Sequence, residues 1–378
     1  MFLIYPGRSA AGTLNIVTAT LERPLPRPAS VRAATAHVPM GPPWWGAVMG
    51  TGILGTLTEL HAGSTAVGAD LARFFLVTGW VLMIAFAAGF AARVIASPSV
   101  FTASVSGVGA ATWGMVSMGV LSVGAATATV VPAWTATEAP LAFHIDEVLW
   151  TIGTLIGLLS TFGFTLGLIK HRPAEPRPAW GLAIVPPMVS ATTGAPFVAR
   201  IGSTGGAFAF LLLLGACFTV SLTLGVVIFS AAYRHHLRAE PIPVPLSTSA
   251  WIPLGVVGQS TAAAQVLAAQ AARFTSADAA HSAQTVANVY GYVMLTVAVP
   301  LVVFAIALTL RGFAQRMPFS PGWWALTFPI GTLSLGALNL AKGSGVGGYG
   351  VASDVAWVVL LCTWTLCATA SVLSLRRT

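Results

Sequence analysis

Charged side chains are scarce in this sequence of 378 residues. Lys and Arg number 18, Asp and Glu number 10, and together they make up 7% of the chain, whereas a soluble domain carries roughly 25%. So few charges cannot solvate the surface of a globule of this size, and 56% of the residues are hydrophobic. The composition therefore excludes an ordinary soluble protein and predicts a chain dissolved in lipid.

The cations are also too thinly spread to bind a polyanion. The formal net charge is +8, but nucleic-acid-binding proteins gather many Lys and Arg residues on one polar face. We therefore expect no nucleic-acid partner.

Cysteines and catalytic motifs are equally rare. The three cysteines, Cys217, Cys362 and Cys367, all fall in apolar runs, which argues against a disulfide framework or a zinc site. The sequence lacks H-E-x-x-H, G-x-S-x-G and paired intramembrane carboxylates, the usual signatures of a metal or nucleophile constellation. We predict no enzyme activity, no metal and no cofactor.

What the chain has in quantity is long apolar runs. A helix needs about 20 apolar residues to cross roughly 30 Å of hydrocarbon, and no alternating pattern of barrel strands is seen. We predict an all-α integral membrane protein with ten spans, near residues 42–60, 72–93, 98–124, 145–169, 179–199, 205–232, 250–272, 284–310, 321–340 and 353–374.

The positions of the cations predict the orientation of these spans. Fourteen of the 18 Lys and Arg residues lie before the first run, after the even-numbered runs or at the C-terminus, and cytoplasmic loops carry such an excess. We predict a multi-pass protein of the cytoplasmic membrane with both termini in the cytoplasm. Residues 1–40 are expected to form a flexible cytoplasmic tail, and residues 41–375 the ten-helix domain.

The spans pair into five hairpins whose first helices open alike. Proline at a helix start and an interfacial aromatic are each common, but their recurrence favours an internal repeat. The five openings are Pro42-Pro43-Trp44-Trp45, Pro98-Ser99-Val100-Phe101, Pro178-Ala179-Trp180, Ser249-Ala250-Trp251 and Pro321-Gly322-Trp323-Trp324.

The two helices of each hairpin differ in composition. Even-numbered runs are bulky and aliphatic, which suits lipid contact, whereas odd-numbered runs are rich in Gly, Pro, Ser and Thr. Broken backbone at membrane depth occurs inside protein or beside a cavity, so we predict an inner ring of odd helices around a central pore and an outer ring of even helices. The predicted helix breaks are Gly50, Gly52, Pro186, Pro187 and Pro329. The alternative is that the small residues only allow close packing.

The repeat also predicts a gate. Counting five residues past the first aromatic slot of each opening selects Met49, Val105, Val185, Val256 and Phe328. An apolar constriction can close a pore by dewetting, and Phe328 is the largest of the five. The alternative is that Phe328 is an ordinary core residue.

Three of these segments resemble the tellurite-resistance/dicarboxylate transporter family. They are Pro43-Trp44-Trp45 with Met49-Gly50-Thr51-Gly52-Ile53, Pro186-Pro187-Met188-Val189-Ser190, and Trp323-Trp324-Ala325-Leu326-Thr327-Phe328-Pro329. That family includes plant slow anion channels, bacterial tellurite-resistance proteins, fungal malate permeases and sulfite efflux pumps. The resemblance implies five hairpins around a pore, a homotrimer, and a phenylalanine of the ninth helix closing the conduit, a position held here by Phe328.

The residues expected along the pore are uncharged. No ionisable residue stands near the centre of an odd run, and the polar candidates there are Thr51, Ser190, Gln259 and Thr327. A pore without fixed charge binds its ion weakly. We expect small anions as substrates, either C4-dicarboxylates such as malate or inorganic anions. The rival function is a proton-coupled exporter of sulfite or tellurite-derived oxyanions.

Cations at the predicted outer ends of three odd runs could attract anions to the mouth. They are Arg200, Arg273 and Lys342, and snorkelling of a long side chain to the interface explains each equally well. His61 is placed in an outer loop. His144 stands with Asp146 and Glu147 at the start of the fourth run, where acids cap a helix N-terminus; a His144/Glu147 pair coupling protons to anion movement is the alternative.

Overall fold

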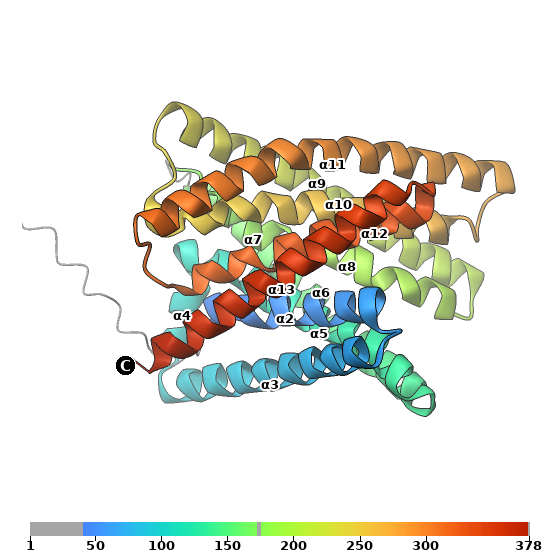
Figure 1. The fold of residues 1–378 in the computed structure, drawn as a ribbon, viewed down its shortest axis with the longest axis horizontal. Coiled ribbons are helices and arrows are strands. Elements are labelled where there is room, and N and C mark those ends of the chain that lie inside the picture. Colours follow the sequence, from blue (N-terminus) through green and yellow to red (C-terminus); the bar gives the residue numbers. More distant parts are fainter. Residues whose placement is uncertain (1–40, 172–174, 377–378) are drawn as a thin grey trace, which may run out of the picture.

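The computed structural model describes residues 41–171 and 175–376. Throughout those residues it is helical, with no strand (Figure 1). The tail predicted over residues 1–40 lies outside the described part.

The chain runs as pairs of helices, most of them introduced by a short 3₁₀ turn. The first half contains η1 (Pro42–Trp44), α2 (Trp45–Ala62), α3 (Ala66–Ala96), α4 (Ser99–Ser104), η2 (Gly107–Thr112), α5 (Trp113–Trp134), η3 (Ala136–Glu138) and α6 (Ala139–His171). The second half contains η4 (Pro178–Trp180), α7 (Gly181–Ile184), α8 (Pro186–Gly194), η5 (Ala195–Arg200), α9 (Thr204–Arg238), η6 (Val244–Trp251), α10 (Ile252–Ala271), α11 (Ala277–Ala314), η7 (Pro321–Leu326), α12 (Phe328–Ser344) and α13 (Gly347–Leu375).

Eight of the described helices are long and apolar enough to cross a membrane, or nine if the bent pair Pro178–Ile184 and Pro186–Arg200 is one span. Helix α2 is not among them, although the sequence predicted a span there. Its apolar residues alternate with Gly and Thr, and its last turns carry Glu59 and His61, which lower its average hydropathy. The chain is nevertheless plainly a multi-pass helical membrane protein.

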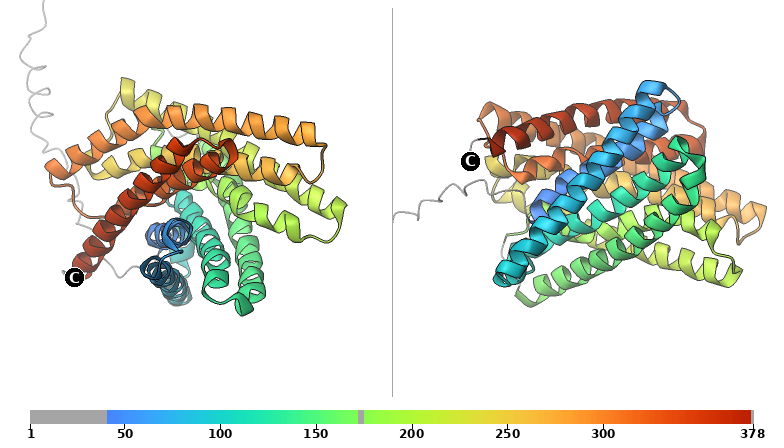
Figure 2. Two further views of the ribbon diagram at one scale, coloured as in Figure 1. Left: turned by 45° about the vertical axis from the view of Figure 1, so that its right-hand side comes forward. Right: turned by 90° about the horizontal axis from the view of Figure 1, so that it is seen from below.

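The helices form two layers. Helices α2, α5, α8, α10 and α12 contact one another in a closed cycle, and each also contacts the long helix that follows it in the sequence. In the segments of α5, α10 and α12, 72% to 78% of the apolar window is buried, against 11% to 33% in α3, α6, α9, α11 and α13. In Figure 1, the outer helices α3 and α11 lie along opposite edges of the bundle, and Figure 2 shows the hairpins from two further sides.

Glycines bring the inner helices together. A Cβ built on Gly52 of α2 would stand 2.7 Å from the Ser122 carbonyl carbon of α5, and one on Gly258 of α10 would overlap the Thr332–Leu333 peptide of α12. Such contacts are possible only where both helices present backbone to each other. The inner layer is therefore packed backbone to backbone.

Tryptophan side chains tie the outer helices to the inner layer. Trp364 Nε1 of α13 donates to Thr51 Oγ1 of α2 at 2.8 Å, and Trp80 Nε1 of α3 donates to Thr127 Oγ1 of α5 at 3.0 Å. Trp150 Nε1 of α6 donates to the Ser190 carbonyl of α8 at 2.9 Å. Each bond satisfies an indole N–H that hydrocarbon would leave unpaired.

Candidate functional site

A cavity of about 150 Å³ lies where the N-terminal ends of the inner helices converge. The lining residues lie in or beside the 3₁₀ turns that precede the inner helices, or in the first turns of those helices. The lining residues are Pro43, Met49, Thr112, Met115, Met118, Ala179, Leu182, Val185, Pro245, Leu246, Thr248, Ser249, Ile252, Gly255, Ser320, Pro321, Gly322, Ala325, Phe328 and Pro329.

Four bulky, buried side chains line this cavity. Met49, Met118, Val185 and Phe328 come from α2, α5, the α7–α8 junction and α12, and each is at most 3% exposed. The fifth inner helix, α10, contributes Ile252 and Gly255. Three of the five residues predicted for a gate, Met49, Val185 and Phe328, therefore line one cavity.

The other two predicted gate residues lie elsewhere. Val105 is 43% exposed just after α4 and lines a separate pocket with Phe101 and Trp113. The predicted alignment of the second opening is thus corrected: α4 is a separate short helix, and Trp113, at the start of α5, occupies the aromatic slot. Met118 then stands five residues past it, followed by Gly119, which matches the pattern of Met49 and Gly50.

Val256 faces away from the cavity for a different reason. It is buried on the side of α10 turned toward α9 and α11, while Gly255, one residue earlier, faces the cavity. One residue turns a helix by 100°, so the fourth opening is out of register by one position.

The predicted helix breaks divide into two groups. The helix is interrupted between Ile184 and Pro186 with a bend of 43°, and α12 begins at Phe328 directly before Pro329. Gly50 and Gly52, by contrast, lie within the continuous helix α2. Both predictions of a break there are corrected: these glycines make room for Thr327 and Ser122 of neighbouring helices.

None of the four polar residues predicted for the pore lines the cavity. Thr51 accepts the Trp364 bond, Ser190 Oγ accepts from Thr154 Oγ1 at 2.8 Å, and Thr327 Oγ1 donates to the Trp324 carbonyl at 2.7 Å. Gln259 is 1% exposed, and its Oε1 has no hydrogen-bond partner among the described residues. All four are packed between helices.

The polar residues that do line the cavity are hydroxyls of the openings, which the sequence analysis missed. They are Thr112, Thr248, Ser249 and Ser320. The signal was present, because each stands one to three residues before the opening's tryptophan. No charged residue is found among the described lining residues.

The three predicted mouth cations lie away from the cavity. Arg200 lies over the Phe143 ring at 4.0 Å, and its Nε is 3.7 Å from Glu147 Oε1. Arg273 and Lys342 are exposed near the C-terminal ends of α10 and α12. The charge of Arg200 is thus partly neutralised by Glu147, whose Oε2 also lies 3.0 Å from His144 Nδ1.

The predictions for His61 and for the acids near His144 are both corrected. His61 lies in the last turn of α2 and not in a loop; its side chain is 5% exposed, with Nδ1 at 2.8 Å from Asp354 Oδ1 and Nε2 at 3.1 Å from Ser353 Oγ. Helix α6 begins at Ala139, so His144, Asp146 and Glu147 lie beyond its first turn and do not cap it. Asp146 is buried against Gly124 of α5, and its Oδ1 is unpartnered among the described residues.

Within the described ranges, no group of three His, Cys, Asp or Glu residues could hold a metal ion.

A family model matches almost the whole length of this chain, and two curated proteins match half of it. A family model described as "SLAC1: Voltage-dependent anion channel" matches residues 39–372. The sulfite efflux pumps SSU1 of Trichophyton rubrum and Arthroderma benhamiae are each 24% identical over 194 residues, or 50% of this chain. The match covers 51% of the length of either pump.

Proposed function

The chain belongs to the SLAC1 family of voltage-dependent anion channels, a family of transport proteins rather than enzymes, and from that premise we propose that small anions cross the membrane through its inner layer. In this proposal all ten helical segments span the membrane, including α2 and the bent pair α7–α8. The five inner segments surround the conduit, and the outer five face lipid and neighbouring subunits.

The observation that carries the proposal is the convergence of five helix N-terminal ends on one uncharged cavity. The N-terminal end of a helix carries a partial positive charge of up to roughly half an elementary charge, which favours anions nearby. The cavity therefore attracts an anion without a fixed cation to hold it. Weak attraction of this kind suits passage better than storage.

The four buried apolar side chains that line the cavity supply the gate. Met49, Met118, Val185 and Phe328 are apolar and almost fully buried, so water and ions are excluded between them. Phe328 has the largest side chain of the four. It is held at the first turn of α12 beside Pro329, where the interrupted backbone lets the ring point into the cavity it lines.

Replacement of this ring tests the gate. Phe328→Ala is expected to raise anion conductance in planar bilayers at least tenfold, because removing the ring opens space that water can enter. Phe162→Ala is the matched control, since Phe162 is 51% exposed on the outer helix α6. If a correctly assembled Phe328→Ala protein conducts no more than the control, Phe328 does not close the conduit.

The substrate has two candidates. Small inorganic anions or C4-dicarboxylates such as malate fit an uncharged channel lining. Sulfite is favoured by the two fungal relatives that are named as sulfite efflux pumps, and the alternative function is a proton-coupled exporter of sulfite or tellurite-derived oxyanions. Flux of chloride, sulfite and malate into proteoliposomes, with and without a pH gradient, separates the two: a requirement for the gradient would indicate a proton-coupled exporter.

We also propose a homotrimer in the cytoplasmic membrane with both termini in the cytoplasm. The outer helices expose many large apolar side chains, which can meet either lipid or another copy. Light scattering of the purified protein in detergent measures the number of subunits. Protease accessibility of a C-terminal tag in intact cells measures the orientation.

A further inference from the structure

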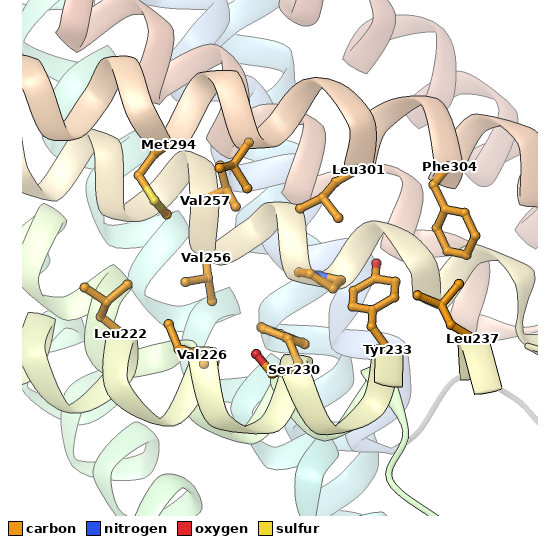
Figure 3. Close-up of a pocket in the computed structure, with 14 residues that line it drawn as sticks. Leu222, Val226, Ser230, Tyr233, Leu237, Val256, Val257, Met294, Leu301 and Phe304 are labelled. Carbon is orange, nitrogen blue, oxygen red and sulfur yellow. The ribbon is translucent and has the colours of Figure 1, made fainter. Parts of the chain in front are cut away.

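A long apolar groove lies on the outer face of the molecule, away from the cavity. It runs between α9 and α11, with α10 as its floor, and has a volume of about 490 Å³ (Figure 3). Leu222 and Val226 line it from α9, and Met294 and Leu301 line it from α11. Gly225 of α9 and Pro253 of α10 also line it, and their small side chains leave space between the helices.

The lining suits hydrocarbon rather than water. Its polar groups are few, and the Tyr233 hydroxyl already donates to the Ala250 carbonyl at 3.3 Å. All three helices around the groove belong to candidate membrane spans. An unfilled groove would forfeit dispersion contacts along its whole length, so within a bilayer it is occupied by an apolar chain.

The groove runs along the membrane-spanning helices for more than the depth of one lipid leaflet. In Figure 3 it extends from Leu222 and Met294 at one end to Leu237 and Phe304 at the other. At a rise of 1.5 Å per residue, Leu222 and Leu237 are about 22 Å apart along α9, compared with roughly 15 Å for half of a hydrocarbon core. The Leu237 end lies at the C-terminal end of α9, on the side predicted to be cytoplasmic.

Cations surround that end. Arg234 and Arg238 are exposed on the last turns of α9, three residues before and one after Leu237. Arg311 of α11 donates from Nη2 to the Ile242 carbonyl at 3.3 Å, across the chain that leaves α9. Glu240 is the acid that stands nearest to Arg234 and Arg238 in the sequence, so cations outnumber acids at this end of α9. Basic residues between helices on the cytoplasmic side attract anionic headgroups.

We propose that this groove binds an anionic phospholipid, with one acyl chain along α9 and α11 and the phosphate beside Arg234 and Arg238. The charge at one end and the apolar length of the rest match the two parts of such a lipid. This inference does not depend on which anion the protein transports.

The test compares lipid binding to the full-length protein and to two pairs of variants. Native mass spectrometry after titration with phosphatidylglycerol or phosphatidylcholine measures how much of each lipid is retained. Val226→Trp fills the groove, and its control is Val227→Trp, because both valines are 60% exposed on α9 but only Val226 lines the groove. The double variant R234Q/R238Q removes the headgroup contacts, and R376Q removes an exposed cation at the end of α13 instead.

We expect wild-type protein to retain phosphatidylglycerol in preference to phosphatidylcholine. Val226→Trp should lower retention of both lipids about tenfold, whereas R234Q/R238Q should lower only the preference, by about tenfold. Val227→Trp and R376Q should behave as wild type. The proposal is overturned if Val226→Trp retains as much lipid as Val227→Trp, or if R234Q/R238Q leaves the preference unchanged. A photo-crosslinker at position 226 that captures a second copy of the chain, and no lipid, would also overturn it.

Discussion

The inner and outer helices are both apolar, yet they are stabilised in different ways. Inner helices approach through glycine and bury their hydroxyls against carbonyls and indoles, as at Gly52 and Thr51. Outer helices expose large aliphatic side chains, such as Val293 and Val297 of α11. The helix that fails the hydropathy criterion, α2, is among the most buried. In this membrane protein the helices rich in small and polar residues are therefore the buried ones. Only neighbouring protein can pack closely against the small residues and bond the polar ones.

The largest expected effect comes from adding one methyl group to an inner contact. Gly258→Ala places a Cβ against the Thr332–Leu333 peptide, and such overpacking against backbone costs about 3 kcal/mol or more. Gly215→Ala of α9 is the control, since nothing lies within 4 Å of its Cβ. It should be neutral or stabilise by up to about 1 kcal/mol. Thermal unfolding in detergent measures both. Equal midpoints would contradict the distinction between the layers.

A smaller loss of stability is expected where a hydroxyl of an inner helix accepts a hydrogen bond from an indole of an outer helix. Thr51→Val leaves Trp364 Nε1 without its acceptor, which costs about 1–3 kcal/mol. Thr365→Val removes an exposed hydroxyl that bonds only within its own helix, and its effect should stay within about 0.5 kcal/mol. Thermal unfolding in detergent measures both variants, and equal midpoints would contradict the expected loss.

Anion flux should distinguish a cavity residue from a surface residue. Met118→Ala removes a bulky side chain from the lining of the cavity. Anion flux should rise about fivefold, which corresponds to a barrier lower by roughly 1 kcal/mol. Val105→Ala, at the exposed position first aligned with it, should leave flux unchanged. Uptake into proteoliposomes at matched protein content measures both. A rise in the Val105 variant alone would restore the original alignment of the second opening.

The smallest effect is expected at the rim of the inner layer. Asp354→Asn removes the carboxylate beside His61, but Asp354 is 64% exposed, so the pair contributes less than about 1 kcal/mol and weakens further in salt. Ser353→Ala should lower the free energy of unfolding by more, about 1 kcal/mol. Ser353 is buried, and its hydroxyl donates to the Ser334 carbonyl at 2.7 Å. The reverse order, measured at low and high salt, would show that exposed charge outweighs buried hydrogen bonds here.

The local sequence predicted the helices well, but it predicted the directions of the side chains less well. Proline at Pro186 and Pro329 acts on its own backbone, so both interruptions could be predicted. Glycine acts on its neighbours, and Gly50 and Gly52 were therefore mistaken for breaks. Val105 was misplaced because proline and phenylalanine near residue 100 imitate an opening, whereas the true one at Trp113 lacks the proline.

By itself, the sequence determined that this protein is helical and lies in a lipid membrane, because hydropathy and proline placement act over a few residues. It also determined that four of the inner helices open with a shared pattern and that Phe328 follows one of these openings. Only the tertiary structure decided which residues meet at the cavity, since a shift of one residue turns a side chain by 100°. It alone paired His61 with Asp354 and assembled the groove over α10, because these neighbours lie tens to hundreds of residues apart in the chain.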